Sequence, residues 1–354
     1  MDSSKSTDSI DASDVSDSLD SSVDGSQLYF PPLESNAWET TSPEAVFPNW
    51  KPENLTHLQD YLQNRNTKSF MILVNGKIVL EEYYEGHDAE TFWYWASAEK
   101  TLTSAVVGVA EHEGLLSLDS PVSDYLGTNW TSVPQDKEVL ITSRHLLTMT
   151  SGLDDSLGDN VSPDSLKYVA DAGTRWAYHN VDVKLQQVIE VATGQPWMDY
   201  FRERLRNQIG MTGGWFEQDD GQIVYGSNMR SMARFGLLAL NNGHWNGVQI
   251  VPETYYVASM QPSQDINQSY GYLWWINGQD SYRLPQVQLD FLGSMIPSGP
   301  NDMRMALGKN DQKIYVVPSQ QMVVIRMGQM AYESTLSLSQ FDNELWEKIN
   351  AVIE

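Results

Sequence analysis

The stretch WYWASAEKTL (residues 93–102) places a hydroxyl, Ser97, and an amine, Lys100, three residues apart. The apolar pattern that follows predicts a helix from Ser97 to Glu113 that ends at Gly114, with Ser97 in its first turn. Side chains three residues apart share one face of a helix. A lysine held out of solvent beside a serine can lose its proton near neutral pH and act as a base toward the hydroxyl. Ser97 is therefore a candidate covalent nucleophile, and Lys100 is its candidate base.

The Ser-x-x-Lys spacing is weak evidence by itself, because a chain with eleven lysines should show it about once by chance. A second group strengthens it. Tyr178-His179-Asn180 is the only Tyr-x-Asn in a chain with 17 tyrosines. A phenolate stabilised by a nearby lysine can take the serine proton and return it to a leaving group, while the amide orients the lysine and the substrate carbonyl. A buried structural tyrosine could occur in the same tripeptide. The order of the motifs along the chain is therefore the stronger evidence for a catalytic site.

That order is Ser97-x-x-Lys100, then Tyr178-x-Asn180 in a helical middle region, then KNDQ (residues 309–312) leading into a predicted strand. It resembles the serine β-lactamase and penicillin-binding-protein superfamily, most closely its class C-like branch. The resemblance covers about residues 50–350. Four further stretches look like segments common in that branch: residues 145–153, 230–237, 270–275 and 312–318.

The resemblance implies roles for individual residues. Ser97 would be the acylated nucleophile, Lys100 its activating base, and Tyr178 the proton shuttle that also activates the deacylating water. Asn180 would position them. The backbone N–H groups of Ser97 and Gln312 would form the oxyanion hole. No metal or cofactor is implied, and which of Lys100 and Tyr178 first removes the proton stays open.

The third element departs from the family pattern. Members that process penicillins or D-alanyl peptides carry Lys-Thr-Gly or Lys-Ser-Gly, whereas this chain has Lys309 followed by Asp311 in place of the glycine. An aspartate adds bulk and negative charge beside the place where a substrate carboxylate would bind. We therefore expect cleavage of an ester or amide in preference to a β-lactam. Two alternatives stay open: Lys309 binds substrate or pairs with Asp311, and the protein is a hydrolase or a catalytically weak penicillin-binding-like sensor or binding module.

The pattern of elements predicts an α+β fold in which helices from both ends of the chain flank an antiparallel sheet. Residues 70–74 and 78–84 flank Asn75-Gly76, which predicts a hairpin. Helices are expected at residues 52–65 and 337–353, and strands at 270–276, 303–307, 313–317 and 322–327. The middle of the chain predicts helices at 143–150, 181–193, 197–208 and 229–242.

Two interleaved domains follow from this arrangement. Residues 28–95 and 255–354 would form the sheet domain, residues 96–254 would form an inserted, mainly helical domain, and the active site would lie at their interface.

Composition excludes several classes of function. The net charge of −25 disfavours nucleic acid and anionic membranes. The chain has no cysteine and no His-Glu-x-x-His pair, which disfavours thiol catalysis and a zinc site. The expected partner is a small ester, amide or short peptide.

Residues 1–27 contain ten serines and seven aspartates, too little apolar surface to fold, and predict a disordered leader. Neither a signal peptide nor a membrane-spanning run is evident in the sequence. The leader reads either as a solvated extension or as the linker of an exported or lipid-anchored protein. The second interpretation predicts an extracytoplasmic location.

Overall fold

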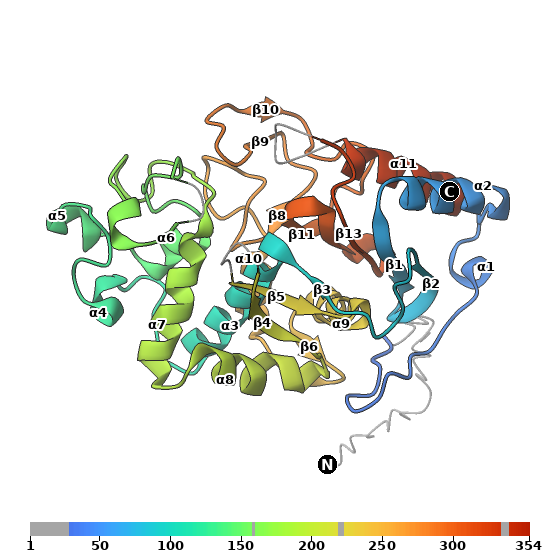
Figure 1. Cartoon of the computed structure of the whole chain (residues 1–354), viewed down its shortest axis with the longest axis horizontal. Helices are drawn as coiled ribbons and strands as arrows, with labels where there is room; N and C mark the ends of the chain where they lie inside the picture. The colour runs from blue at the N-terminus through green and yellow to red at the C-terminus, as the bar shows by residue number, and fades with distance from the viewer. Residues whose placement is uncertain (1–27, 158–159, 219–222, 334–339) are drawn as a thin grey trace, which may run out of the picture.

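The computed structural model describes residues 28–157, 160–218, 223–333 and 340–354, so the predicted leader 1–27 and residues 337–339 of the last predicted helix lie outside it. A six-stranded antiparallel sheet, in the order β2-β1-β13-β12-β11-β8, forms the centre of the molecule (Figure 1). Strands from both ends of the chain meet in it, as predicted. Its members are β1 (Thr67–Val74), β2 (Lys77–Tyr83), β8 (Trp275–Ile276), β11 (Arg304–Gly308), β12 (Gln312–Val317) and β13 (Met322–Gly328).

The β1–β2 hairpin turns at Asn75 and Gly76, whose φ angles are +49° and +80°. Both angles are positive, as a tight hairpin turn requires, and asparagine and glycine tolerate them best. The predicted hairpin is confirmed.

Helices cover both faces of the sheet. On one face lie α2 (Pro52–Asn64) and α11 (Phe341–Ile353), with the ring of Tyr315 packed edge-on against Trp346 at 5.6 Å. On the other face lies α9 (Met229–Leu240), packed so closely that a Cβ added at Gly236 would come within 2.6 Å of Val323. The predicted helical domain 96–254 includes α9, whose apolar face is buried on the sheet.

Except for the short helix α1 (Pro43–Val46), the remaining helices lie beside the sheet, toward the left in Figure 1. Helix α3 runs from Lys100 to His112 and follows a 3₁₀ turn, η1 (Ala96–Glu99), so Ser97 precedes the α-helix and does not lie in its first turn as predicted. Together with the sheet they give the predicted α+β class. The others are α4 (Ser123–Leu126), α5 (Gln135–Glu138), α6 (Ser143–Leu147), α7 (Val183–Thr193), α8 (Trp197–Phe201) and α10 (Glu253–Ser259).

Two local predictions need correction. The strand predicted at 270–276 is reduced to β8, because Leu273 adopts a left-handed φ of +63° that breaks an extended run. A small sheet in the order β3-β5-β4 was missed, although it includes the residues just before Ser97. The short elements are α1 (Pro43–Val46), β3 (Trp93–Tyr94), β4 (Gly214–Glu217), β5 (Ile223–Ser227), β6 (His244–Trp245), β7 (Val248–Gln249), β9 (Ser281–Tyr282) and β10 (Phe291–Leu292).

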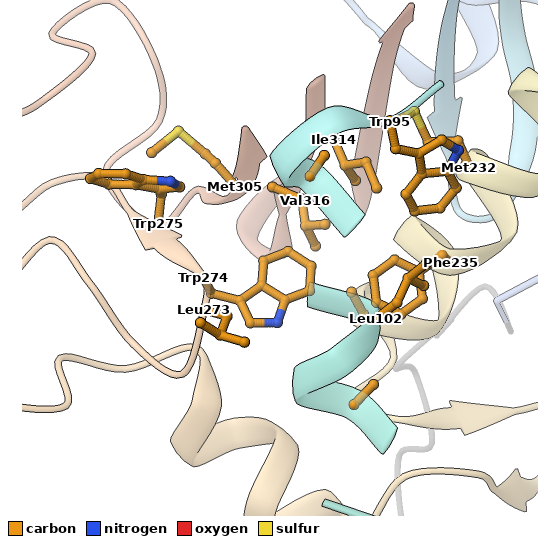
Figure 2. Close-up of a cluster of buried hydrophobic side chains, with 14 of the residues drawn as sticks. Trp95, Leu102, Met232, Phe235, Leu273, Trp274, Trp275, Met305, Ile314 and Val316 are labelled. Atoms are coloured by element: carbon orange, nitrogen blue, oxygen red, sulfur yellow. The ribbon is translucent and has the colours of Figure 1, made fainter. Parts of the chain in front are cut away.

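A continuous apolar core connects the sheet to the start of α3 (Figure 2). Trp95, which directly precedes η1, packs on Phe235 of α9 at 6.1 Å, and Phe235 stacks on Trp274 at 6.0 Å. Leu102, Ile314 and other fully buried side chains fill the space between these rings. This packing fixes the turn that carries Ser97 against the sheet. Among the described residues, no helix is both long and apolar enough to cross a membrane.

Candidate active site

The turn that carries Ser97 is held from both sides. The Trp95 N–H donates to the carbonyl of Tyr225 on β5 at 2.8 Å, and the Trp95 indole N–H donates to the hydroxyl of Ser227 at 2.8 Å. On the other side the turn meets the end of β11, where a Cβ added at Gly308 would lie 2.3 Å from the Trp95 carbonyl. Only glycine allows that close approach. The turn is therefore packed between the small β3-β5-β4 sheet and the six-stranded sheet.

The residue before the nucleophile has an unfavourable backbone conformation. Ala96 has a φ of +47°, in the left-handed region that side chains other than glycine rarely occupy. Such strain persists only where the surroundings enforce it, and it is concentrated at functional sites. Ser97 itself is partly exposed, in contrast to buried Ala98 beside it.

Lys100 is the centre of a buried polar cluster. Its ammonium donates to Asn180 Oδ1 at 2.7 Å and to Asp182 Oδ1 at 2.6 Å, and it lies 5.7 Å from the ring centre of Tyr178. The backbone N–H of Lys100 donates to the carbonyl of Ser97. The structure thus brings together Lys100, Tyr178 and Asn180, which are far apart in sequence, one helical turn after Ser97.

Asp182 was not among the predicted site residues. It closes the short 3₁₀ turn Asn180–Asp182 that leads into α7, where an acidic residue is expected simply to cap the helix. No side-chain cap is formed, and the carboxylate is directed to Lys100 instead. The local sequence therefore suggests a helix cap, and this explanation of Asp182 is incorrect.

The charge of Lys100 differs from the sequence-based expectation. Burial favours the neutral amine, but the carboxylate of Asp182, together with Tyr178 and Glu99, outweighs it and raises the pKa of Lys100 above its usual value. A lysine with a raised pKa stays an ammonium ion at neutral pH. This direction favours the ammonium form over the neutral amine expected from the sequence.

Tyr178 lies in an aromatic cluster at the edge of the helical region. Its ring stacks on Trp275 at 5.6 Å and meets Tyr270 and Trp176 at 6.1 and 6.3 Å. These three neighbours are almost fully buried, while Tyr178 stays partly exposed. The cluster holds the phenol ring on one side, so its position is fixed by packing as well as by polar contacts.

The third predicted element has a different geometry from the one expected. Lys309, Asn310 and Asp311 form the turn between β11 and β12, with left-handed φ angles of +60° and +61° at Asn310 and Asp311. The Asn310 amide donates to the hydroxyl of Tyr94 at 2.7 Å, which holds the turn beside η1. Lys309 is exposed at this turn.

Asp311 does not pair with Lys309. Its carboxylate lies 3.2 Å from the ammonium of Lys313 and accepts the backbone N–H of Ala331 at 2.9 Å. Burial raises the pKa of this carboxyl, but Lys313 and these hydrogen bonds outweigh it and leave the pKa below its usual value. Asp311 is buried in a network with Lys313 and Ala331, and its predicted place beside a substrate carboxylate stays a prediction.

Gln312 is also placed differently. It begins β12, an interior strand between β11 and β13, and its side-chain amide bridges to the N–H and carbonyl of Gly328. Across the hairpin it pairs with Gly308. Its side chain is fully buried between the strands.

Backbone direction along β11 decides which N–H groups are free. The N–H of Asn277 donates to the carbonyl of Met303 at 3.0 Å, so Met303 directs its polar groups toward the β8 side. In an antiparallel strand alternate residues do the same, which puts Leu307 on that side and turns Gly308 toward Gln312. The register therefore directs the Gln312 N–H toward Gly308 within the sheet. β8 pairs only with the first two residues of β11, so the N–H of Leu307 lies on an edge without a strand partner in the described part of the chain.

Glu99, which is partly exposed, lies on the side of η1 that faces the small sheet. Its carboxylate accepts the backbone N–H of Tyr225, and removal from water raises its pKa to about 8. Neither residue was expected from the sequence to border the site. Within the described ranges, no group of three or more histidine, aspartate or glutamate side chains is arranged to hold a metal ion.

The family match indicates a hydrolase of the β-lactamase fold. The family model described as Beta-lactamase matches residues 56–327, and the chain belongs to that family.

Three similar proteins illustrate the relationship. An uncharacterized protein of Alkalihalophilus pseudofirmus is 28% identical over 296 residues, covering 73% of this chain and 82% of the relative. The structure of a Bacillus anthracis protein provisionally named a 6-aminohexanoate-dimer hydrolase superposes with a TM-score of 0.69 at 20% identity, covering 91% of this chain and 89% of that one. EstCE1, named as a hydrolase with promiscuous acyltransferase activity, superposes with a TM-score of 0.63 at 12% identity, covering 84% and 97%. At these identities the two structures establish the fold alone.

Proposed function

We propose that the protein is a serine hydrolase that cleaves an ester or amide of small or medium size through an acyl-enzyme on Ser97, without a cofactor. The observation that carries this proposal is the buried cluster in which Lys100 binds Asn180 beside Tyr178, one turn after the strained residue that precedes Ser97. Such a cluster provides a fixed cation and a proton-carrying phenol next to a hydroxyl, as covalent acyl transfer requires.

The proposed reaction has two halves. In the first, the Ser97 proton passes to the phenolate oxygen of Tyr178 as the bond from Ser97 Oγ to the acyl carbon forms. Tyr178 then gives a proton to the leaving oxygen or nitrogen as its bond to the acyl carbon breaks. In the second half, water attacks the acyl carbon, its proton goes to Tyr178, and Ser97 recovers a proton as the acid leaves. Asn180 positions Lys100 throughout.

We assign the oxyanion hole to the backbone N–H groups of Ser97 and Leu307. The second replaces Gln312, whose N–H is directed to Gly308 by the strand register. Leu307 belongs to the strand that lies against η1, and its N–H is on the edge not covered by β8. Preorganised N–H donors of this kind stabilise the charge that develops on the carbonyl oxygen.

Ester or amide cleavage is preferred over β-lactam cleavage for a reason different from the one expected. The Asp311 carboxylate pairs with Lys313 in the sheet network. The strand beside Ser97 reads Arg304-Met305-Ala306-Leu307-Gly308 and so lacks the Lys-Thr-Gly or Lys-Ser-Gly sequence typical of members that process penicillins. The aspartate at position 311 was also the reason for considering a binding module without turnover. Its pairing with Lys313 in the sheet network removes that reason.

Hydrolysis rates over a substrate panel test the proposal. The panel contains p-nitrophenyl esters of increasing chain length, a chromogenic cephalosporin and D-alanyl peptides, each with wild type and Ser97→Ala. We expect ester cleavage by wild type to exceed cephalosporin cleavage and to be lost in Ser97→Ala. The reverse ranking would contradict the substrate preference, and equal rates for both proteins would contradict the role of Ser97.

A further inference from the structure

The ion pair between Lys100 and Asp182 is not explained by the roles proposed for Ser97, Tyr178 and Asn180, none of which calls for a carboxylate beside Lys100. The ammonium and the carboxylate are 2.6 Å apart, and both side chains are about 95% buried, with 5% and 4% of their surface exposed. A buried ion pair this close keeps both partners charged, because separating or neutralising either one would leave the other uncompensated.

The surrounding groups do not supply the same charge. Glu99 is a second acid that interacts electrostatically with Lys100, and its pKa of about 8 makes it largely protonated at neutral pH. His179 is buried, its pKa is lowered to about 4 by burial and by Lys100, and it is therefore neutral. Tyr178 and Asn180 are the other polar groups that face Lys100 in the described residues. Asp182 is thus the carboxylate that balances Lys100 at neutral pH.

We propose that Asp182 is a positioning residue that holds Lys100 as an ammonium ion, so that Lys100 orients Asn180 and Tyr178 and does not remove the proton from Ser97. This inference rests on the proposed function and assigns the proton transfer within it. Lys100 keeps its three protons through the cycle. The Ser97 proton goes to Tyr178, as written above, and no additional reactant is needed.

The sign of the expected pH effect follows from this assignment. If the charged form of Lys100 is required, reactivity of Ser97 is lost at alkaline pH, as Lys100 deprotonates. In Asp182→Asn, burial of Lys100 is no longer opposed by a carboxylate, so its pKa falls and the alkaline loss moves to lower pH. If neutral Lys100 were the base, the same variant would make Ser97 more reactive at neutral pH.

The experiment measures the rate at which a fluorophosphonate labels Ser97 between about pH 5 and about pH 10, in wild type and in Asp182→Asn. Because the pKa of Lys100 is raised above its usual value in wild type, we expect no alkaline loss of labelling in wild type within this range, and a loss within it in Asp182→Asn. Asp182→Glu, which keeps the negative charge, should retain more of the wild-type labelling at alkaline pH than Asp182→Asn. Faster labelling of Asp182→Asn at neutral pH, or an unchanged profile, would overturn the proposal.

Asp171→Asn is the matched control. It breaks the ion pair between Lys137 and Asp171, which has the same 2.6 Å distance but is solvent-exposed, with 35% and 49% of the side-chain surfaces accessible. Its labelling profile should match wild type. A shift equal to that of Asp182→Asn would show that the effect is not specific to the site.

A second measurement needs no variant of Asp182 to fold. Nitrogen NMR of the lysine side chains, with the Lys100 signal identified by its absence in Lys100→Met, reports the charge of Lys100 directly in the wild-type protein. We expect an ammonium signal from neutral pH to about pH 10. An amine signal at neutral pH would overturn the assignment. Failure of wild type to label at any pH would instead contradict the proposed function, while NMR still decides the state of Lys100.

Discussion

Two buried lysines lie in similar surroundings, yet only one belongs to the site. Lys100 has 5% of its side chain exposed and pairs with Asp182 at 2.6 Å. Lys313 has 4% exposed and lies 3.2 Å from Asp311 and 2.9 Å from Asp342. In both cases burial favours the neutral amine, and carboxylates outweigh it and raise the pKa of the lysine.

The neighbours of the two lysines differ in kind. Asp342 comes from α11 and also accepts the hydroxyl of Tyr315 at 2.6 Å, so the Lys313 cluster fastens the last helix to the sheet. Lys100 instead follows the strained turn of Ser97 and faces Tyr178. A buried ion pair alone does not mark an active site; we assign the site to Lys100 because the proposed nucleophile, Ser97, and the proposed proton carrier, Tyr178, lie beside it.

The comparison predicts the largest effect for activity. Lys100→Met should lower the ester-cleavage rate by at least about 1,000-fold, because it removes the cation that positions the proton-transfer groups. Lys313→Met should change the rate per folded molecule by less than about threefold, because no group of its cluster faces Ser97. Rates normalised to the folded fraction measure both, and equal losses in the two variants would contradict the distinction.

A smaller but clear effect is expected for the stability of Lys313→Met. Removing the ammonium leaves Asp311 and Asp342 buried without a cation, which should lower the free energy of unfolding by about 3–5 kcal/mol. Urea unfolding followed by tryptophan fluorescence measures this change. A loss below about 0.5 kcal/mol would show that the cluster does not hold α11 on the sheet.

Acid stability gives a third test. The pKa of Asp311 is lower in the folded protein than in the unfolded chain, so its contribution is present above about pH 4 and is lost as the pH falls through the lowered value. Asp311→Asn should therefore be less stable than wild type at pH 7, with a smaller difference at about pH 3. Urea unfolding at both values measures this. A constant difference between wild type and Asp311→Asn would argue against the ion pair as its source.

Lys309→Ala should have the smallest effect. Lys309 is exposed beside η1, and a substrate carboxylate is the partner we propose for it. The substitution should raise KM by less than about tenfold for acidic substrates and leave neutral esters unchanged. Steady-state kinetics with one acidic and one neutral ester of equal length compare the two. Equal effects on both esters would remove Lys309 from substrate binding.

The sequence predicted the fold class, the sheet built from both ends of the chain, and the convergence of Lys100, Tyr178 and Asn180. These rest on hydrophobic periodicity and on residues in family order. The sequence could not show whether the residues Lys309, Asn310 and Asp311 begin a strand or form the turn before it. That difference changes the surroundings of Asp311 and Gln312.

Asp182 is a residue near Lys100 that the sequence analysis missed. Its position before α7 has an ordinary explanation as a helix cap, and only the three-dimensional packing of α7 against α3 shows that its carboxylate meets Lys100. Similarly, the free N–H of Leu307 follows from strand pairing that no local pattern specifies. Contacts between distant segments, more than residue types, determine the missing part of the site.

The most direct measurement of the central claim is the mass of the peptide that contains Ser97 after treatment of the folded protein with a fluorophosphonate. The account predicts an adduct on Ser97 in wild type, none on the corresponding peptide of Ser97→Ala, and a strongly reduced rate in Lys100→Met. An unmodified Ser97 in folded wild-type protein, or equal labelling of wild type and Ser97→Ala, would contradict it.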